Sequence, residues 1–154
     1  MIGYLGLSAL ICGSDLVIKE TVKKKVDENS KTYVCEDKLI VTKFYNRGAA
    51  LGKLSEHPTL LKGITIFGVG SLLGALTAIS GLKGHYLQKF GLSMMLGGAG
   101  SNAYERISYG KVTDYVQLNV KNPKYRRIVY NLGDFAIFAG SLCLISGELF
   151  RMER

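Results

Sequence analysis

The sequence predicts a mainly α-helical integral membrane protein in which four transmembrane helices carry a small β-sheet. Residues 63–82 contain no charged side chain, and this run matches the roughly 20 residues that cross about 30 Å of hydrocarbon. Many of the 19 glycines lie inside apolar stretches, which suits helices that approach closely in lipid. The charged residues gather in polar segments between the apolar runs. A chain of 154 residues leaves no room for a second domain beside four helices, so residues 1–154 are predicted to form one unit.

The four helices are expected over residues 1–19, 60–82, 87–105 and 128–150. The second of them contains the uncharged run. The other three carry polar or charged side chains, so they cross a bilayer only where those side chains face a protein interior or water.

The polar segments 26–56 and 107–124 are expected to supply the sheet. Residues 31–44 are rich in β-branched and aromatic side chains with partial alternation, which predicts a strand pair rather than a helix. Residues 112–120 show the same pattern. The short segment 82–89 is expected to connect two helices at the opposite end.

Two aspartates stand at the edges of apolar segments and are the candidate reactive groups, Asp114 and Asp134. A charged carboxylate at mid-bilayer costs about 2.5 to 3.5 kcal/mol on insertion scales, so such residues near membrane segments indicate function. For Asp114 alone, a solvated loop carboxylate is the ordinary interpretation. Asp134 lies inside the last apolar run, where a helix facing lipid would not keep it.

Five sequence blocks, in order, resemble those of the lipoprotein signal peptidase family, also called signal peptidase II. Residues 44–52 resemble its Asn-x-Gly-Ala-Ala-Phe-Gly block, and residues 97–106 its Gly-Gly-Ala-x-x-Asn-x-x-Asp-Arg block. Residues 112–115 resemble its Val-x-Asp-Phe element, and residues 131–134 its Asn-x-Ala-Asp block. Asp15 and Lys19 have the spacing of an Asp-x-x-x-Lys pair at the end of that family's first helix.

The resemblance implies an aspartyl endopeptidase of the bacterial inner membrane, with Asp114 and Asp134 as its catalytic pair. Such an enzyme removes the signal peptide from prolipoproteins just before a cysteine that carries diacylglycerol. No cofactor, no metal and no nucleic acid is expected. The expected partners are diacylglyceryl prolipoproteins, membrane lipids and globomycin-type inhibitors, and the expected state is a monomer. The residues expected to bind substrate or support the site are Asn46, Gly48, Gly98, Asn102, Glu105, Arg106 and Asn131.

The chemistry of paired carboxylates agrees with this assignment. Two carboxylates about 3 Å apart cannot both ionise, so they share a proton. One then acts as general base toward a water, and the other as general acid toward the carbonyl or the leaving amine. Asn102 stands in the block before Asp114, and Asn131 stands three residues before Asp134; at both positions an amide can orient a carboxylate or hold a substrate backbone.

The distribution of basic residues and the family resemblance predict opposite orientations of the chain in the membrane. Residues 19–56 and 105–127 contain 15 Lys and Arg against two in the segment 82–89, which predicts cytoplasmic loops. The resemblance instead implies cytoplasmic termini, with the active site and an extracytoplasmic β-cradle on the other face. We favour the second orientation because five blocks fix the topology together, and basic loops then face anionic headgroups.

Three positions depart from the family pattern. Glu105 stands where the family has aspartate, Leu51 replaces phenylalanine and Gly133 replaces alanine. Glu105 is expected to pair with Arg106, whereas Asp15 and Lys19 are expected to form a local ion pair.

The alternative function is that of a non-catalytic or weakly active family member that binds lipid-modified peptides or lipids through the same groove. Retention of both aspartates argues against it, because a protein that only binds would tolerate their loss.

Overall fold

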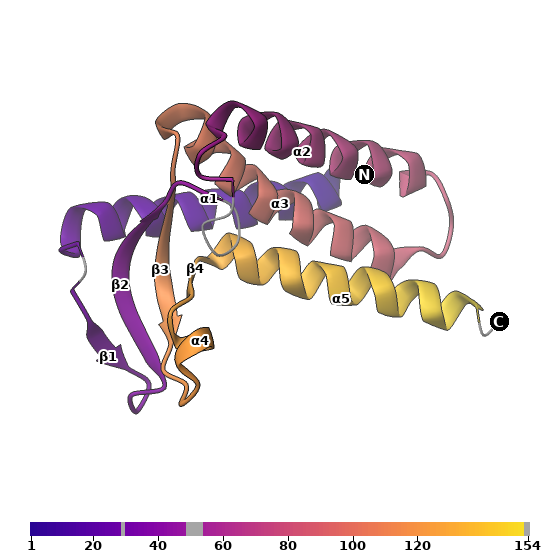
Figure 1. Ribbon diagram of the computed structural model, residues 1–154. Helices are drawn as coiled ribbons and strands as arrows, with labels where there is room; N and C mark the ends of the chain where they lie inside the picture. Colours follow the sequence, from indigo (N-terminus) through magenta and orange to yellow (C-terminus); the bar gives the residue numbers. More distant parts are fainter. Residues whose placement is uncertain (29, 49–53, 153–154) are drawn as a thin grey trace.

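Four long helices and a four-stranded sheet make up the computed structural model, which describes residues 1–28, 30–48 and 54–152. The long helices are α1 (Ile2–Lys25), α2 (Pro58–Ser80), α3 (Tyr86–Tyr109) and α5 (Leu132–Met152). A short helix, α4 (Pro123–Arg126), lies after the third strand. Figure 1 shows the sheet at one end of the long helices and both chain termini toward the other end.

The sheet is antiparallel throughout, in the order β1-β2-β3-β4. Its strands are β1 (Thr32–Val34), β2 (Leu39–Asn46), β3 (Val112–Leu118) and β4 (Val129–Tyr130). A register shift between Val41 and Phe44 places Phe44 opposite Asp114 in the central pair of strands. The predicted small sheet is therefore confirmed.

The helix α3 lies at the centre of the helical part and packs against α1, α2 and α5. Glycines bring α3 and α5 into backbone contact. A Cβ on Gly91 would lie 2.5 Å from the carbonyl oxygen of Gly140, and a Cβ on Gly140 would lie 2.5 Å from that of Gly91. Such close backbone approach is the usual packing device of helices in lipid, where the hydrophobic effect does not drive association.

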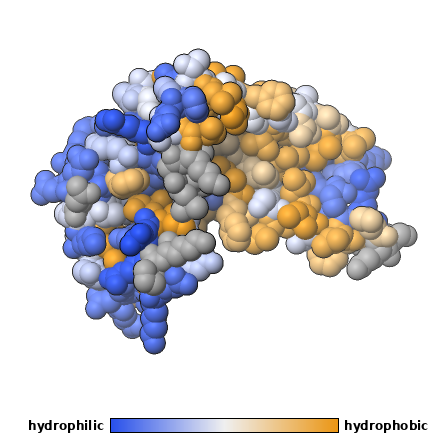
Figure 2. All heavy atoms as spheres, in the orientation of Figure 1, coloured by the Kyte–Doolittle hydropathy of each residue, from blue (hydrophilic) through white to orange (hydrophobic). Residues whose placement is uncertain are grey.

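The outer surface of the helices is apolar. Phe67 on α2 is 77% exposed and Phe138 on α5 is 65% exposed. Figure 2 shows the hydrophobic residues mainly over the helices and the hydrophilic residues gathered over the sheet end. Within the described residues, α1, α2 and α5 are long and apolar enough to cross a membrane. The helix α3 is as long but less apolar, because it carries many polar side chains.

Several element boundaries differ from those expected. The first helix ends at Lys25 instead of residue 19, because three lysines in its last turn favour the negative end of the helix dipole. The third helix continues to Tyr109, where Gly110 ends it with φ of 69°. The last helix begins at Leu132 instead of residue 128, because residues 129–130 pair with β3 as a strand.

Candidate active site

The two aspartates meet where the sheet joins the helices. Asp114 is the third residue of β3, and Asp134 lies in the first turn of α5. Both line one cavity of about 380 Å³. The other residues of that cavity are Asn46, Asn102, Arg106, Val112, Ile128, Val129, Tyr130, Ile137, Phe138 and Ser141.

Asn131 holds both carboxylates. Its backbone N–H donates to Oδ2 of Asp134 at 3.1 Å, while its side-chain oxygen accepts the Asp134 N–H at 2.8 Å. This is the reciprocal pattern of a capping box, with Asn131 as the N-cap and Asp134 three residues later. The side-chain amide of the same residue donates to Oδ1 of Asp114 at 2.7 Å. Asn131 is fully buried, so these bonds have no competition from water.

Two further asparagines complete the set of donors. Asn46 at the end of β2 donates to Oδ2 of Asp114 at 3.1 Å. Asn102 on α3 donates to Oδ1 of Asp134 at 3.0 Å. Each of the four carboxylate oxygens therefore accepts one amide hydrogen bond. Lone pairs remain on each oxygen for a proton or a water, because a carboxylate accepts about four hydrogen bonds.

The pKa of Asp114 is raised to about 7, mainly by burial of the carboxyl and next by the nearby charge of Asp134. The hydrogen bonds from Asn46 and Asn131 oppose this shift because they stabilise the ionised form. A carboxyl with a pKa near 7 exchanges its proton readily at neutral pH. This is the property that general acid–base chemistry requires.

A buried ionic cluster fixes the orientation of Asn102. The Lys19 ammonium donates to Oδ1 of Asn102 at 2.7 Å, so the amide nitrogen of Asn102 must face Asp134. Lys19 also donates to the Ser101 hydroxyl at 3.0 Å and pairs with Asp15 at 2.7 Å. The expected ion pair of Asp15 and Lys19 is thus confirmed, and it lies fully buried behind the site.

Tyr115 connects this cluster to α5. Its hydroxyl donates to Oδ1 of Asp15 at 2.9 Å and accepts the Leu132 N–H at 2.9 Å. Burial and the neighbouring Asp15 carboxylate raise the pKa of Tyr115, so its hydroxyl stays protonated. Tyr115 and Ser101 are not among the residues that the sequence predicts for the site. Strand alternation was the available signal for Tyr115, because it directs this side chain away from the side that Asp114 faces.

The expected pairing of Glu105 with Arg106 is wrong. Consecutive helix residues point about 100° apart, so the two side chains leave α3 in different directions. Glu105 pairs with Lys23 at 2.6 Å and lies 3.7 Å from Lys19. Its carboxylate also accepts the backbone N–H of Thr113 at 2.7 Å and the Thr113 hydroxyl at 2.9 Å. Glu105 therefore anchors the strand residue that precedes Asp114.

Arg106 points toward the cavity and connects three segments of the chain. Its guanidinium donates to the carbonyl of Gly48 at 3.1 Å and lies 3.4 Å from the Thr65 hydroxyl. Gly48 in turn donates its N–H to the side-chain oxygen of Asn46 at 3.0 Å. Nε of Arg106 is buried and has no hydrogen-bond partner among the described residues.

Gly98 lies beside the site without lining its cavity. A Cβ on Gly98 would be 2.2 Å from the carbonyl oxygen of Gly133, so this glycine lets α3 and α5 meet just behind Asp134. A Cβ on Gly133 would be 3.0 Å from side-chain oxygens of both Asn131 and Asp15. The remainder of the block 44–52, including Leu51, lies outside the described residues.

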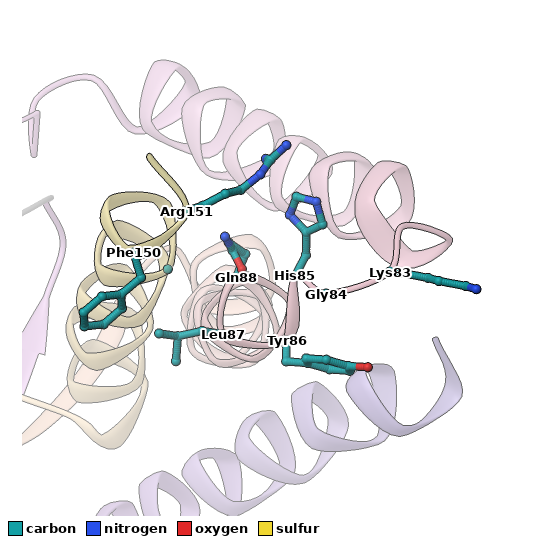
Figure 3. A pocket seen from close by; sticks show the side chains of 9 residues that line it. Lys83, Gly84, His85, Tyr86, Leu87, Gln88, Phe150 and Arg151 are labelled. Carbon is teal, nitrogen blue, oxygen red and sulfur yellow. The ribbon is translucent and has the colours of Figure 1, made fainter. Parts of the chain in front are cut away.

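A larger cavity of about 420 Å³ lies at the other end of the helices, away from the two aspartates. Figure 3 shows it between the turn after α2, the start of α3 and the end of α5. Its lining residues are Lys83, Gly84, His85, Tyr86, Leu87, Gln88, Gly147, Phe150 and Arg151. None of the residues expected to form the site is among them.

Solved structures share this fold. One bacterial membrane enzyme superposes with a TM-score of 0.84 at 22% identity, covering 99% of this chain and 90% of that chain. A second bacterial membrane enzyme superposes with a TM-score of 0.81 at 23% identity, covering 97% of this chain and 94% of that chain.

Sequence comparisons identify the family. The lipoprotein signal peptidase of Solibacter usitatus is 30% identical over 97% of this chain and 91% of its own length. That of a Janthinobacterium species is 28% identical over 100% of this chain and 92% of its own length. The family model for signal peptidase II matches residues 7–150, a range that holds both aspartates and all three asparagines around them. The chain therefore belongs to the signal peptidase II family of aspartic peptidases.

Proposed function

We propose that Asp114 and Asp134 are the catalytic dyad of an endopeptidase that removes the signal peptide from diacylglyceryl-modified prolipoproteins. The observation that carries this proposal is the double role of Asn131, which donates to Asp114 at 2.7 Å and to Asp134 at 3.1 Å. One buried residue thus fixes two carboxylates against the same cavity. Family membership supplies the class of substrate.

The dyad works with a single shared proton. The ionised carboxylate removes a proton from a water molecule, and the water oxygen attacks the scissile carbonyl carbon. The protonated carboxyl gives its proton to the carbonyl oxygen. When the C–N bond breaks, a proton passes to the departing amine and the carbonyl is restored as a carboxylic acid. The products are the signal peptide and a lipoprotein with a free amino group on its modified cysteine.

The asparagines keep both carboxylates in place during these proton transfers. Asn46 and Asn102 each hold one oxygen of one aspartate, and Lys19 prevents the Asn102 amide from turning. Fixed dipoles of this kind need no reorganisation when charge moves, which is the main source of electrostatic catalysis.

All four long helices cross the membrane in this proposal. The helix α3 is enclosed by the three apolar helices, and its buried polar residues face the protein interior, as lipid requires. The active site and the sheet lie at the extracytoplasmic face, whereas both termini are cytoplasmic; Figure 1 shows the termini at the end away from the sheet. Residues 1–154 act as a single membrane-embedded domain.

This orientation is tested by cysteine labelling from the outside of intact cells. The native Cys35 is exposed in the turn between β1 and β2, so we expect an impermeant maleimide to label it. Lys83→Cys in a chain with Cys35 replaced by serine should react only after permeabilisation. The opposite pattern would place the sheet in the cytoplasm, as the charge count predicts.

The cavity wall suits a lipid-modified, apolar substrate. Ile137 and Phe138 of α5 and Ile128 before β4 line it beside the two aspartates. Globomycin-type inhibitors are proposed to occupy the same cavity. A monomer suffices, because all the groups around the two aspartates come from one chain.

Cleavage of a synthetic diacylglyceryl prolipoprotein peptide, followed by mass spectrometry, tests this function. Asp114→Asn and Asp134→Asn should each abolish cleavage and leave folding intact, because an amide keeps the shape but cannot share a proton. Asp27→Asn removes an exposed carboxylate and serves as the matched control. Near-full activity in either dyad variant would contradict the dyad. Binding of the peptide without cleavage by the unchanged protein would instead support the non-catalytic alternative.

A further inference from the structure

A second cavity adjoins the one that holds the two aspartates. It has a volume of about 340 Å³ and is lined by Phe44, Asn46, Arg47, Gly48, Ser55, Arg127, Ile128 and Val129. Asn46, Ile128 and Val129 line both cavities, so the two spaces are neighbours along one groove. They meet at the residue whose amide holds Asp114.

Two arginines give this second cavity its charge. Arg47 directly follows β2, and Arg127 stands two residues before β4. Both side chains are exposed, and neither forms an ion pair or a hydrogen bond with another described residue. No carboxylate lines the cavity among the described residues. Lys19 and Lys23, by contrast, each pair with a carboxylate.

The groove changes in polarity from one end to the other. Its α5 end is lined by Ile137 and Phe138, whereas its sheet end is lined by Arg47 and Arg127. The aspartates line the cavity of the α5 end, and Asn46, which donates to Asp114, lines both cavities. A substrate with an apolar segment before the cleaved bond therefore places that segment along α5 and the residues after the bond near the arginines.

We propose that Arg47 and Arg127 form a subsite for an acidic side chain downstream of the cleaved bond. This inference rests on the proposed function and adds a substrate preference to it. A guanidinium binds a carboxylate through two parallel hydrogen bonds, and this cavity holds two guanidinium groups that have no carboxylate partner among the described residues. Electrostatic complementarity of this kind selects among substrates.

The test uses pairs of diacylglyceryl prolipoprotein peptides that carry Asp or Asn at one position after the modified cysteine, with that position moved stepwise along the first few residues. At the preferred position the unchanged protein should cleave the Asp peptide with a kcat/KM about five- to tenfold higher than the Asn peptide, as expected for one or two partly exposed ion pairs. The effect should lie in KM and should shrink in high salt, which screens exposed charges.

Substitution of the two arginines tests whether they cause the preference for the Asp peptide. Arg47→Gln with Arg127→Gln should reduce the ratio between the two peptides to about one while cleavage of the Asn peptide persists. The matched control is Arg126→Gln, which removes the same charge from a residue that does not line the cavity. It should keep the preference.

Three outcomes would overturn the subsite. The first is an equal kcat/KM of the unchanged protein for the Asp and Asn peptides at every position. A control variant that loses as much preference as the double variant would show a general effect of surface charge. The third is that phosphatidylglycerol bicelles accelerate cleavage of both peptides equally, and only when both arginines are present. That result would show that Arg47 and Arg127 bind lipid headgroups.

Measuring how tightly the peptides bind tests the subsite separately from the proposed function. The Kd of both peptides for the Asp114→Asn protein, in which no cleavage is expected, should differ by the same factor as kcat/KM. Failure of the unchanged protein to cleave any peptide contradicts the proposed function, whereas equal Kd values contradict the subsite.

Discussion

Asn131 and Asp134 cap one another: the Asp134 N–H donates to the Asn131 side-chain oxygen at 2.8 Å, and the Asn131 N–H donates to the Asp134 carboxylate at 3.1 Å. The start of α5 and the position of the carboxylate are consequently one structural feature. The same cap therefore fixes the position of a carboxylate that we propose is catalytic, and the side-chain amide of Asn131 donates to Asp114.

Substitution of Asn131 separates these two roles. Asn131→Ser retains an N-cap oxygen but lacks the amide that reaches Asp114, so it should fold with nearly unchanged stability and lose most activity. Asn131→Ala lacks both and should also lose about 1 kcal/mol of stability, the usual value of a cap. Thermal unfolding and peptide cleavage are the two measurements. Equal stability of the serine and alanine variants would show that the cap is not what holds α5.

The pH dependence of cleavage depends on the pKa of Asp114, which is about 7. Activity should fall as the pH rises through that value, because the dyad then loses its shared proton. Asn46→Ala removes a hydrogen bond that stabilises the ionised form, so it should raise the pKa further and move this alkaline limb to higher pH. The check is kcat against pH. Asn119→Ala, a change in an amide bonded to the Asp37 carbonyl, should leave the limb in place.

Glu105 should prove a stabilising residue with an effect on catalysis through β3. Glu105→Gln leaves Lys19 and Lys23 without one of their carboxylates and should cost about 3 to 5 kcal/mol if the cluster behaves as a buried pair. Glu105→Asp keeps the charge but is one methylene shorter, so it should contact Thr113 less closely and lower kcat.

The matched control for Glu105 is Glu20→Gln. Glu20 lies 3.6 Å from Lys23, but it is 53% exposed, so its loss should cost about 0 to 1 kcal/mol. Chemical unfolding and cleavage rates report the two effects. Unchanged or higher turnover in Glu105→Asp would show that β3 keeps Asp114 in place without this anchor.

Gly98→Ala should damage both stability and activity. The new Cβ would lie 2.2 Å from the Gly133 carbonyl oxygen, so α3 and α5 would have to separate beside Asp134. We expect a loss of about 1 to 3 kcal/mol, typical of overpacking, together with a loss of cleavage. The same change at Gly74 on α2 meets no atom within 4 Å and should be neutral or stabilising. Similar behaviour of the two variants would contradict a special role for the Gly98 contact.

Much of the fold could be predicted from the sequence because helices and strands depend on local patterns of side chains. The uncharged run at residues 63–82 predicted α2 (Pro58–Ser80), and β-branched residues predicted the strands. The pair Asn131 and Asp134 was predicted from the family resemblance, because an aspartate three residues after an asparagine is a weaker sequence signal of a helix start than a glutamate or glutamine there. The boundary of α5 was placed four residues early because strand β4 is too short to give a pattern of its own.

The sequence by itself determined which residues are proposed to carry the chemistry, since the aspartates and asparagines stand in recognisable blocks. Only the tertiary structure decided their partners. Lys19 and Asn102 are 83 residues apart and meet because α1 packs on α3, and Glu105 takes Lys23 instead of the adjacent Arg106 because of the helix rotation between neighbours. Periodicity reports one segment at a time, whereas contacts between segments depend on how closely the backbones pack. In this protein, glycines such as Gly98 set the distance between the helix backbones. The sequence does not show which glycines do so, because that depends on where the opposing helix lies.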